Sequence, residues 1–274
     1  MNIRITRTTL SLAAAAATAA ALLPVLQSPA AADTSATSAT SAAPAADWPR
    51  PKRVQSVTAT IPIKGVKDYD FTRLVGSGAL GKGDQSENQP PILELADGAT
   101  VSNVIIGAPA ADGIHCKGTC TLKNVWWEDV GEDAATQKGT KAGQTMTVDG
   151  GGAREAADKV FQQNGPGTFV IRNFLVEDFG KLYRSCGVCK TQYQRHVVVD
   201  NVRVKAPGKE IVGINSTPYG DTAKLSRITI TGDAARRIAV CNKYRGVTVG
   251  EPAKVGTGAD GRNCIYKSTD ITYK

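Results

Sequence analysis

Four carboxylates gather within six residues of the chain, at Glu128, Asp129, Glu132 and Asp133. The cluster is unexpected, because the 274 residues together carry a formal net charge of +8. Such a group of acids can form a solvated surface, an acid and base pair for catalysis, or a set of ligands for a hard cation such as Ca²⁺. The choice among these depends on which other segments fold around the cluster.

Short β-rich runs recur along the chain, and many carry an asparagine, aspartate or glycine at a similar place. Successive anchors are 21, 25, 24, 28, 26 and 19 residues apart, at Asn103, Asn124, Asp149, Asn173, Asn201, Arg227 and Gly246. A repeat of this length, built from strands and turns, is typical of a β-solenoid. We therefore predict an all-β, single-domain right-handed parallel β-helix, with a β-sandwich or jelly roll as the alternative.

The coil spacing brings charged residues from different segments together, because residues one coil apart in a β-helix lie about 4.8 Å apart in space. Asp112 precedes Glu132 and Asp133 by 20 and 21 residues, and Asp158 follows Asp133 by 25. We expect these four acids to form one column over three coils, which is costly unless a cation lies among them. Carboxylate oxygens suit Ca²⁺, whereas zinc prefers histidine and cysteine.

A column of basic residues follows the acidic one. Lys181 and Arg184 come 22 and 25 residues after Lys159. The two columns together predict a groove that binds the carboxylates of a polyanion. We expect Ca²⁺ to bridge the acids and the polyanion, and Arg184 to bind a carboxylate in a bidentate manner. Glu128 and Asp129 fall outside both columns, so we assign them strand-end or supporting roles.

The first residues of the chain indicate export. Arg4 and Arg7 precede a long apolar run, and small alanines at 30–32 could be cleaved by a signal peptidase. We predict a signal peptide over residues 1–32, a disordered Ser/Thr/Ala-rich linker over 33–47 and the β-helix domain over 48–274. The expected product is a secreted, extracellular monomer without a membrane span, and a retained membrane helix is the weaker alternative.

Six cysteines in an exported chain predict disulfides. We expect neighbours to pair in chain order, as Cys116 with Cys120, Cys186 with Cys189 and Cys241 with Cys264. A zinc site and a thioredoxin-like redox centre are the alternatives, and export disfavours zinc. The histidines, His115 and His196, are expected to be packed or surface residues, and the neighbouring Trp126 and Trp127 should point to opposite faces of a strand.

A basic exported domain favours an acidic partner, which could be nucleic acid, an anionic envelope or an acidic polysaccharide. Nucleic-acid-binding signatures are missing from the sequence, and its lysines and arginines are scattered. We therefore expect no nucleic-acid partner.

Several long blocks resemble the signature blocks of the pectate lyases of polysaccharide lyase family three. They are "ENQPPILELADGATVSNVIIG", "ADGIHC", "NVWWEDVGEDAAT", "DKVFQQNGPGT" and "GKLYRSCGVCKTQYQRHV". The resemblance spans about Gln55 to Lys274, with one departure at Pro109, where the family pattern has asparagine. It implies a secreted, Ca²⁺-dependent enzyme on a parallel β-helix that cleaves de-esterified polygalacturonate (pectate) by β-elimination and gives 4,5-unsaturated oligogalacturonides.

The resemblance also implies roles for individual residues. The implied Ca²⁺ ligands are Asp112, Glu132, Asp133 and Asp158. The implied catalytic and substrate-binding residues are Lys159 as the base, Lys181 and Arg184 as substrate-binding or alternative catalytic groups, Glu87 as an acidic residue near the groove, and Lys190 as a further substrate contact. A polygalacturonase-like hydrolase that uses the carboxylates of residues 128–133 is one alternative function, and a non-catalytic pectin-binding β-solenoid is another.

Overall fold

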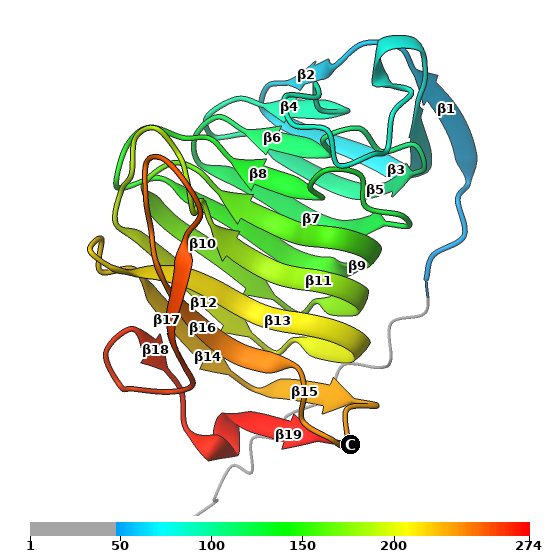
Figure 1. Ribbon diagram of the computed structural model, residues 1–274. Helices are drawn as coiled ribbons and strands as arrows, with labels where there is room; N and C mark the ends of the chain where they lie inside the picture. The colour runs from blue at the N-terminus through cyan, green and yellow to red at the C-terminus, as the bar shows by residue number, and fades with distance from the viewer. Residues whose placement is uncertain (1–47) are drawn as a thin grey trace, which may run out of the picture. The chain divides into compact units, whose positions relative to one another are not determined.

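The computed structural model describes residues 48–274, so the signal peptide and linker predicted over 1–47 lie outside the described residues. The described part is built almost entirely from 19 strands that coil into a parallel β-helix (Figure 1). This confirms the fold class that the repeat predicted. Within residues 48–274, no helix is long and apolar enough to cross a membrane.

The strands vary in length because several of them bend from one wall of the coil into the next. They are β1 Arg53–Val57, β2 Ile61–Ile63, β3 Val66–Gly76, β4 Leu93–Leu95, β5 Thr100–Gly107, β6 Ile114–Cys116, β7 Cys120–Trp127, β8 Ala135–Gln137, β9 Thr145–Gln163, β10 Gly167–Arg172, β11 Leu175–Ser185, β12 Arg195–Asp200, β13 Arg203–Thr217, β14 Thr222–Ser226, β15 Ile228–Thr231, β16 Ala239–Arg245, β17 Ala253–Thr257, β18 Cys264–Ile265 and β19 Ile271–Tyr273. Two 3₁₀ turns, Gly78–Leu80 and Ser268–Asp270, complete the described elements.

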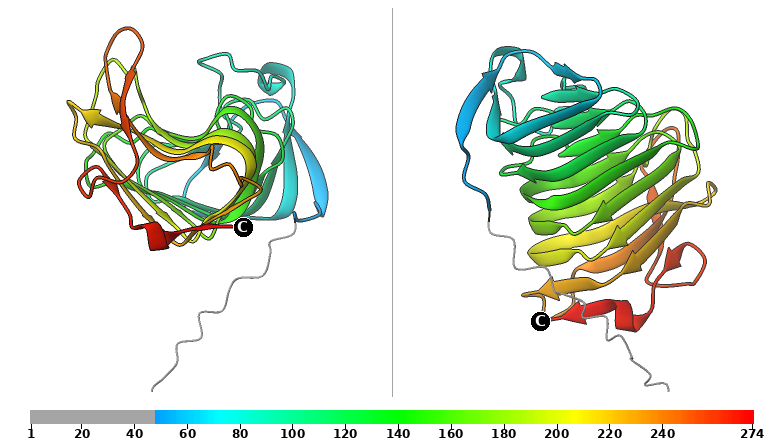
Figure 2. Two further views of the ribbon diagram at one scale, coloured as in Figure 1. Left: turned by 60° about the horizontal axis from the view of Figure 1, so that its bottom comes forward. Right: turned by 180° about the vertical axis from the view of Figure 1, so that it is seen from behind.

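Three parallel stacks of strands enclose one interior (Figure 2, left). The first stack contains β10, β12, β14 and β18 with the first parts of β5, β7 and β9. The second contains β1, β15 and β19 with the ends of β3, β5 and β7, the middle of β9 and the first parts of β11 and β13. The third stack contains β2, β4, β6, β8, the ends of β9, β11 and β13, and β16. Only β17 pairs antiparallel, as a hairpin arm on β16.

The anchors of the repeat form the corner between the first and second stacks. Asn103, Asn124, Asn173 and Asn201 have φ values of 50° to 56°, in the left-handed region that asparagine tolerates better than most residues. Their side chains bond from coil to coil, for example Asn124 Nδ2 to Asn103 Oδ1 at 2.8 Å. The recurring asparagines therefore mark one turn per coil. Gly246 is an exception, because it follows the end of β16 and lies outside this corner.

Apolar and aromatic side chains from all three stacks fill the interior. Trp127 packs edge-on against Phe161 with ring centroids 5.7 Å apart, and Phe161 contacts Phe169 at 5.4 Å. Trp126 points outward and packs against Trp48 at 5.0 Å. The prediction that the two neighbouring tryptophans point to opposite faces is therefore confirmed, and both serve packing.

The three disulfides pair as predicted in chain order. All six cysteines lie within residues 48–274, and none of them is free. The alternatives of a thiolate zinc site and a reactive dithiol are therefore excluded in this structure. The first disulfide joins the end of β6 to the start of β7, and the second lies within the loop that follows β11.

Candidate active site

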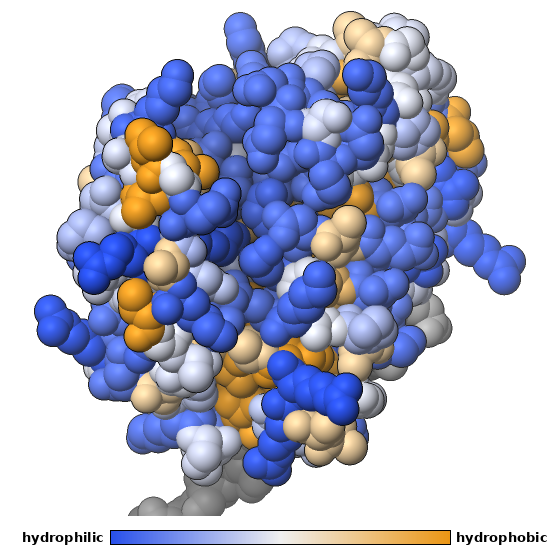
Figure 3. All heavy atoms as spheres, viewed as in Figure 1, coloured by the Kyte–Doolittle hydropathy of each residue, from blue (hydrophilic) through white to orange (hydrophobic). Residues whose placement is uncertain are grey.

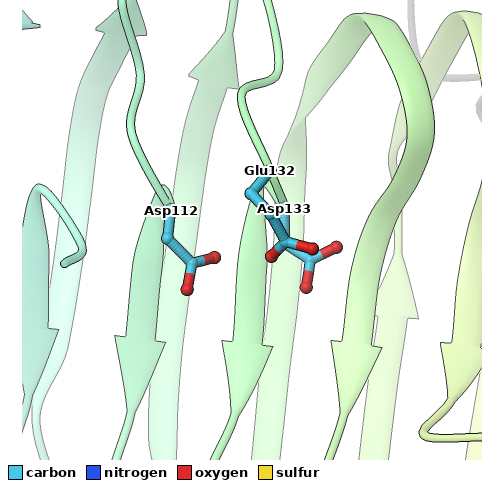
Figure 4. A group of neighbouring side chains, drawn as sticks. All are labelled: Asp112, Glu132 and Asp133. Carbon is cyan, nitrogen blue, oxygen red and sulfur yellow. The ribbon is translucent and has the colours of Figure 1, made fainter. Parts of the chain in front are cut away.

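Three carboxylates from two adjacent coils converge in front of the third stack (Figure 4). Asp112 lies just before β6, and Glu132 and Asp133 lie just before β8. One oxygen from each side chain falls within 4.8 Å of the other two, and all three residues are buried. Because β6 and β8 pair in parallel, with Ile114 opposite Ala135, the loops before them come together. We call these three residues the acid cluster.

Two glycines allow the loops of the acid cluster to touch. Gly113 has a φ of +48°, and a Cβ there would overlap the backbone oxygens of Asp133 and Ala134. A Cβ on Gly131 would overlap the backbone of Ala111. Only glycine therefore fits at these two places without a shift of the backbone.

The acid cluster holds more negative charge than its protein neighbours neutralise. Burial raises the pKa of Asp133 well above its ordinary value, and the charges of Glu132 and Asp112 act in the same direction against the opposing Lys159. Burial likewise raises the pKa of Glu132. Asp112 Oδ1 and Asp133 Oδ1 are buried without a hydrogen-bond partner. Unpaired carboxylate oxygens in a buried, negative site fit a hard cation such as Ca²⁺.

Lys159 is the cation that the chain itself places at the acid cluster. Its Nζ lies 3.1 Å from Glu132 Oε1, 3.5 Å from Asp133 Oδ1 and 3.0 Å from Asp158 Oδ2. Burial lowers the pKa of Lys159, but these three carboxylates outweigh burial and the net shift is upward. Lys159 is therefore a charged partner of the acids.

The acidic column differs from the sequence prediction by one residue. Ala135 pairs with Phe161, so counting back two residues along each strand sets Asp133 beside Lys159, whereas the spacing had suggested Asp158. The Asp158 side chain is 42% exposed and binds Lys159 and Lys181. The structure thus places Asp158 outside the acid cluster, on the basic side of the groove.

The basic column divides into two places. Lys181 pairs with Lys159 in the register of β9 and β11, as the spacing of 22 residues predicted. Arg184 lies three residues further along β11, in register with Gln162. It is buried, and its Nη1 donates to Ser185 O at 2.8 Å and to Asn215 Oδ1 at 2.9 Å.

Glu87 and Lys190 lie on loops, the first between the turn Gly78–Leu80 and β4 and the second between β11 and β12. Glu87 is exposed, and its charge contributes to the raised pKa of Glu132, which indicates that the two carboxylates are near each other. Gln85 Nε2 ties the same loop to Gly131 O at 2.6 Å. Lys190 lines a cavity of about 250 Å³, and so does Lys138.

The other two acids of the opening segment are outside the acid cluster. Glu128 forms an ion pair with Arg73 at 2.6 Å, and Asp129 is exposed. This agrees with the supporting roles assigned to them. Of the carboxylates at 128–133 from which the hydrolase alternative would draw its pair, only Glu132 and Asp133 belong to the acid cluster.

Sequence reasoning missed two polar contacts of the acid cluster. His115 Nε2 lies 2.6 Å from Asp112 Oδ2, and both side chains are buried, so His115 is packed as expected but also orients an acid. Lys138 Nζ lies 3.8 Å from the same oxygen, Asp112 Oδ2. The spacing of one coil between His115 and Lys138 was visible in the sequence, but it gave no reason to connect either residue with Asp112.

Asn215 lies in the sequence "NST", which matches a glycosylation acceptor and which we attribute to chance. The structure supports this interpretation, because Asn215 is completely buried. Its side chain accepts from Arg184 and donates to Cys186 O at 2.7 Å. A glycan on this nitrogen would remove a hydrogen bond at the back of the groove.

Comparisons with known proteins agree with the geometry. The sequence profile described as pectate lyase matches residues 45–251. The chain is 43% identical over 227 residues to the probable pectate lyase E of Neosartorya fischeri, covering 81% of this chain and 85% of that one. It resembles the crystal structure of the catalytic domain of pectate lyase PelI from Erwinia chrysanthemi, with 33% identity, a TM-score of 0.69, and coverage of 81% of this chain and 100% of that one.

A further crystal structure of PelI from Erwinia chrysanthemi, in complex with tetragalacturonic acid, matches with 34% identity and a TM-score of 0.67, covering 80% of this chain and 71% of that one. The profile covers well over half of the chain, and the relatives match along most of their own length. The chain therefore belongs to the pectate lyase family, an enzyme family, as the long sequence blocks predicted.

Proposed function

We propose that the chain is a Ca²⁺-dependent pectate lyase that cleaves de-esterified polygalacturonate by β-elimination and releases 4,5-unsaturated oligogalacturonides. The observation that carries this proposal is the acid cluster, in which three buried carboxylates, two of them with an oxygen that accepts no hydrogen bond, adjoin Lys159. Family membership and the tetragalacturonic acid bound by PelI support the class of substrate.

Asp112, Glu132 and Asp133 would hold the cation, and Asp158 is the fourth ligand implied by the sequence resemblance. When bound, Ca²⁺ supplies a Lewis acid for the uronate carboxylate and offsets the carboxylate charge around Lys159. The substrate is a polyanion, so Lys181 and Arg184 on the neighbouring coils would bind its other carboxylates. The hydrophilic surface over the third stack fits such a sugar chain (Figure 3).

In β-elimination a base removes the C5 proton, α to the uronate carboxylate, and the glycosidic oxygen leaves from C4. Lys159 is the proposed base, because its Nζ adjoins the acid cluster that would hold the cation. It accepts a proton only when neutral, so the reaction requires alkaline conditions. Arg184 is the second candidate, since burial lowers its pKa despite the opposing charge of Glu210.

The substitutions Lys159→Ala and Arg184→Lys separate these two roles. The base should lose about a hundredfold or more in kcat, the range typical of general base catalysis, with KM nearly unchanged. A residue that only binds substrate should raise KM instead. Measuring kcat and KM for both variants on polygalacturonate therefore identifies the base.

Lys190 extends the proposed substrate groove. It lines a cavity of about 250 Å³ that also includes Lys138, Asn164 and Tyr193. Lys138 connects this cavity to the acid cluster through its contact with Asp112. We propose that a sugar unit beyond the cleavage site lies here, with Lys190 beside its carboxylate.

A single assay distinguishes the lyase from its alternatives. Polygalacturonate is incubated with the protein in Ca²⁺ or in a chelator, and ultraviolet absorbance and reducing ends are both recorded. Absorbance from a new double bond that disappears with the chelator supports the lyase. Reducing ends without absorbance would support a hydrolase, and neither signal would support a pectin-binding solenoid.

We also propose that the enzyme is secreted and acts as a monomer. The supporting observation for export is the arginine-flanked apolar run within residues 1–32. Sequencing the N-terminus of the exported protein should find cleavage near residue 32. Light scattering of the purified protein should give the mass of one chain.

A further inference from the structure

Arg184 is held in an arrangement that leaves two of its three guanidinium nitrogens available. It projects from β11, and its Nη1 makes all of its hydrogen bonds to the described residues. Nε and Nη2 donate to no described residue, and neither atom is among the fully buried polar atoms that lack a partner. Two parallel N–H groups are the arrangement that binds a carboxylate in a bidentate manner.

Tyr244 on β16 forms a platform for this guanidinium. The Arg184 guanidinium carbon lies 4.1 Å from the centroid of the Tyr244 ring. Contact with the face of a guanidinium leaves its edge free, so the ring can fix Arg184 without competing for its N–H groups.

Glu210 on β13 anchors the platform. Tyr244 Oη donates to Glu210 Oε2 at 2.7 Å, and Asn242 Nδ2 donates to the same oxygen. Glu210 lies one coil beyond Lys181 in register, is buried, and keeps Oε1 without a hydrogen-bond partner. A buried carboxylate in this state is costly, which indicates a role beyond packing.

Gly213 makes room for the arrangement. A Cβ at this position would overlap Glu210 Oε1 and the Arg184 side chain at Cδ. The carboxylate of Glu210 and the stem of Arg184 therefore both lie in the space that a side chain at residue 213 would fill.

We propose that Tyr244 and Glu210 are positioning residues that hold the Arg184 guanidinium ready to bind a uronate carboxylate of the substrate. The inference rests on the proposed function, because it assumes that Arg184 contacts a polygalacturonate chain. Glu210 fixes the Tyr244 hydroxyl, the Tyr244 ring fixes the plane of the guanidinium, and Arg184 meets the substrate. Neither Tyr244 nor Glu210 was predicted as a site residue from the sequence, because they lie on β16 and β13 rather than on β11.

The test is a double-mutant cycle on Arg184→Ala and Tyr244→Leu, with kcat and KM on polygalacturonate and the affinity for tetragalacturonic acid measured in a chelator. We expect Tyr244→Leu to lower kcat/KM about tenfold, which is the size of a desolvated cation–π contact. In the double variant the loss should equal that of Arg184→Ala alone, because Tyr244 acts through Arg184. Tyr244→Phe keeps the ring and should lose only about threefold, the scale of one hydrogen bond.

The matched control is Tyr273→Leu, because Tyr273 packs under Arg236 with 4.6 Å between guanidinium carbon and ring centroid, outside the groove. It should leave kcat/KM and the tetragalacturonic acid affinity unchanged. Thermal unfolding of each variant shows whether it folds. If Tyr244→Leu does not fold, Tyr244→Phe takes its place in the double-mutant cycle.

The outcomes separate this inference from the proposed function. If Arg184→Ala loses activity while Tyr244→Leu stays within twofold of the wild type, or if the two losses add fully, the positioning role is overturned and the lyase stands. If Arg184→Ala loses nothing, both the role of Arg184 in binding substrate and the positioning role are overturned. If no variant, nor the wild type, makes unsaturated product, the proposed function itself is wrong.

Discussion

Replacing Asp133 by asparagine tests the acid cluster most directly, because the change keeps the shape of the side chain and removes its charge. A cation present at about 100 times its Kd stabilises a fold by about 2.7 kcal/mol. For a domain of this size that gain raises Tm by about 5 to 11 °C. Removing a residue that only hydrogen-bonds to a metal ligand weakens the affinity for the metal about 10- to 100-fold. Removing a ligand itself should therefore weaken the affinity for Ca²⁺ by at least about a hundredfold. The Ca²⁺-induced rise in Tm of Asp133→Asn should then fall to about 1 to 2 °C.

When a chelator removes the cation, Asp133→Asn should instead protect the protein, because the uncharged side chain avoids the cost of a buried charge. The pKa of Asp133 in the folded state is raised, mainly by burial, so the stability that this group contributes is present at low pH and lost as pH rises through the folded pKa. The cation-free wild type should therefore lose Tm between acidic and alkaline pH, and Asp133→Asn should lose less. Thermal unfolding across pH, with and without Ca²⁺, measures both effects.

Two further variants complete this experiment. Asp129→Asn removes an exposed acid outside the acid cluster and should keep the full Ca²⁺-induced rise in Tm. Asp158→Asn decides whether this residue, which binds two lysines in the structure, is a ligand as the sequence resemblance implies. A normal Ca²⁺ response in Asp133→Asn would refute the assignment of the acid cluster as the cation site.

The remaining predictions concern pH, support of the cluster and its backbone. Activity should rise from neutral to alkaline pH, because Glu132 and Asp133, whose pKa values are raised, must be ionised to bind Ca²⁺ and Lys159 must be neutral to act as a base; a maximum in kcat/KM at acidic pH would contradict this. His115→Ala should weaken Ca²⁺ affinity about tenfold in calorimetry, because it removes the partner that orients Asp112. Gly113→Ala should destabilise the fold by more than about 2 kcal/mol in denaturant unfolding, whereas Gly143→Ala, with open space at the Cβ position, should stay within about 1 kcal/mol of the wild type.

The repeat in the sequence predicted much of the fold because the corner asparagines recur once per coil. The step of 21 residues from Asn103 to Asn124 equals the register between β5 and β7, so the neighbourhood of Asp112 and Asp133 followed from counting alone. The next step, 25 residues from Asn124 to Asp149, is one residue short of the register between β7 and β9. The count could not resolve single residues, since loops between strands differ in length from coil to coil.

That limit explains the difference at Asp158 and Lys159. Side chains on a strand alternate between faces, so an error of one residue moves a side chain from the groove to its edge. Pairing of Ala135 with Phe161 settles the register and places Lys159 beside the acids. The contact between Arg184 and Tyr244 could not be predicted from the sequence. It depends on how β11 and β16 end and on a buried glutamate on the strand between them.

The order of charges along the third stack connects the cation site with the substrate site. Asp112 and Asp133 lie on consecutive coils, Lys159 and Lys181 on the next two, and Glu210 on the one after, at a spacing of about 4.8 Å per coil. A cation held at the acidic coils and a uronate carboxylate attracted by the basic coils must then lie side by side. The acid cluster is costly without a cation, because Asp112 Oδ1 and Asp133 Oδ1 are buried without a hydrogen bond, and the ion pair with Lys159 does not outweigh the burial of Glu132 and Asp133. We infer that stability of the cation-free protein is given up at this place so that the proposed cation site lies next to Lys159, the proposed base.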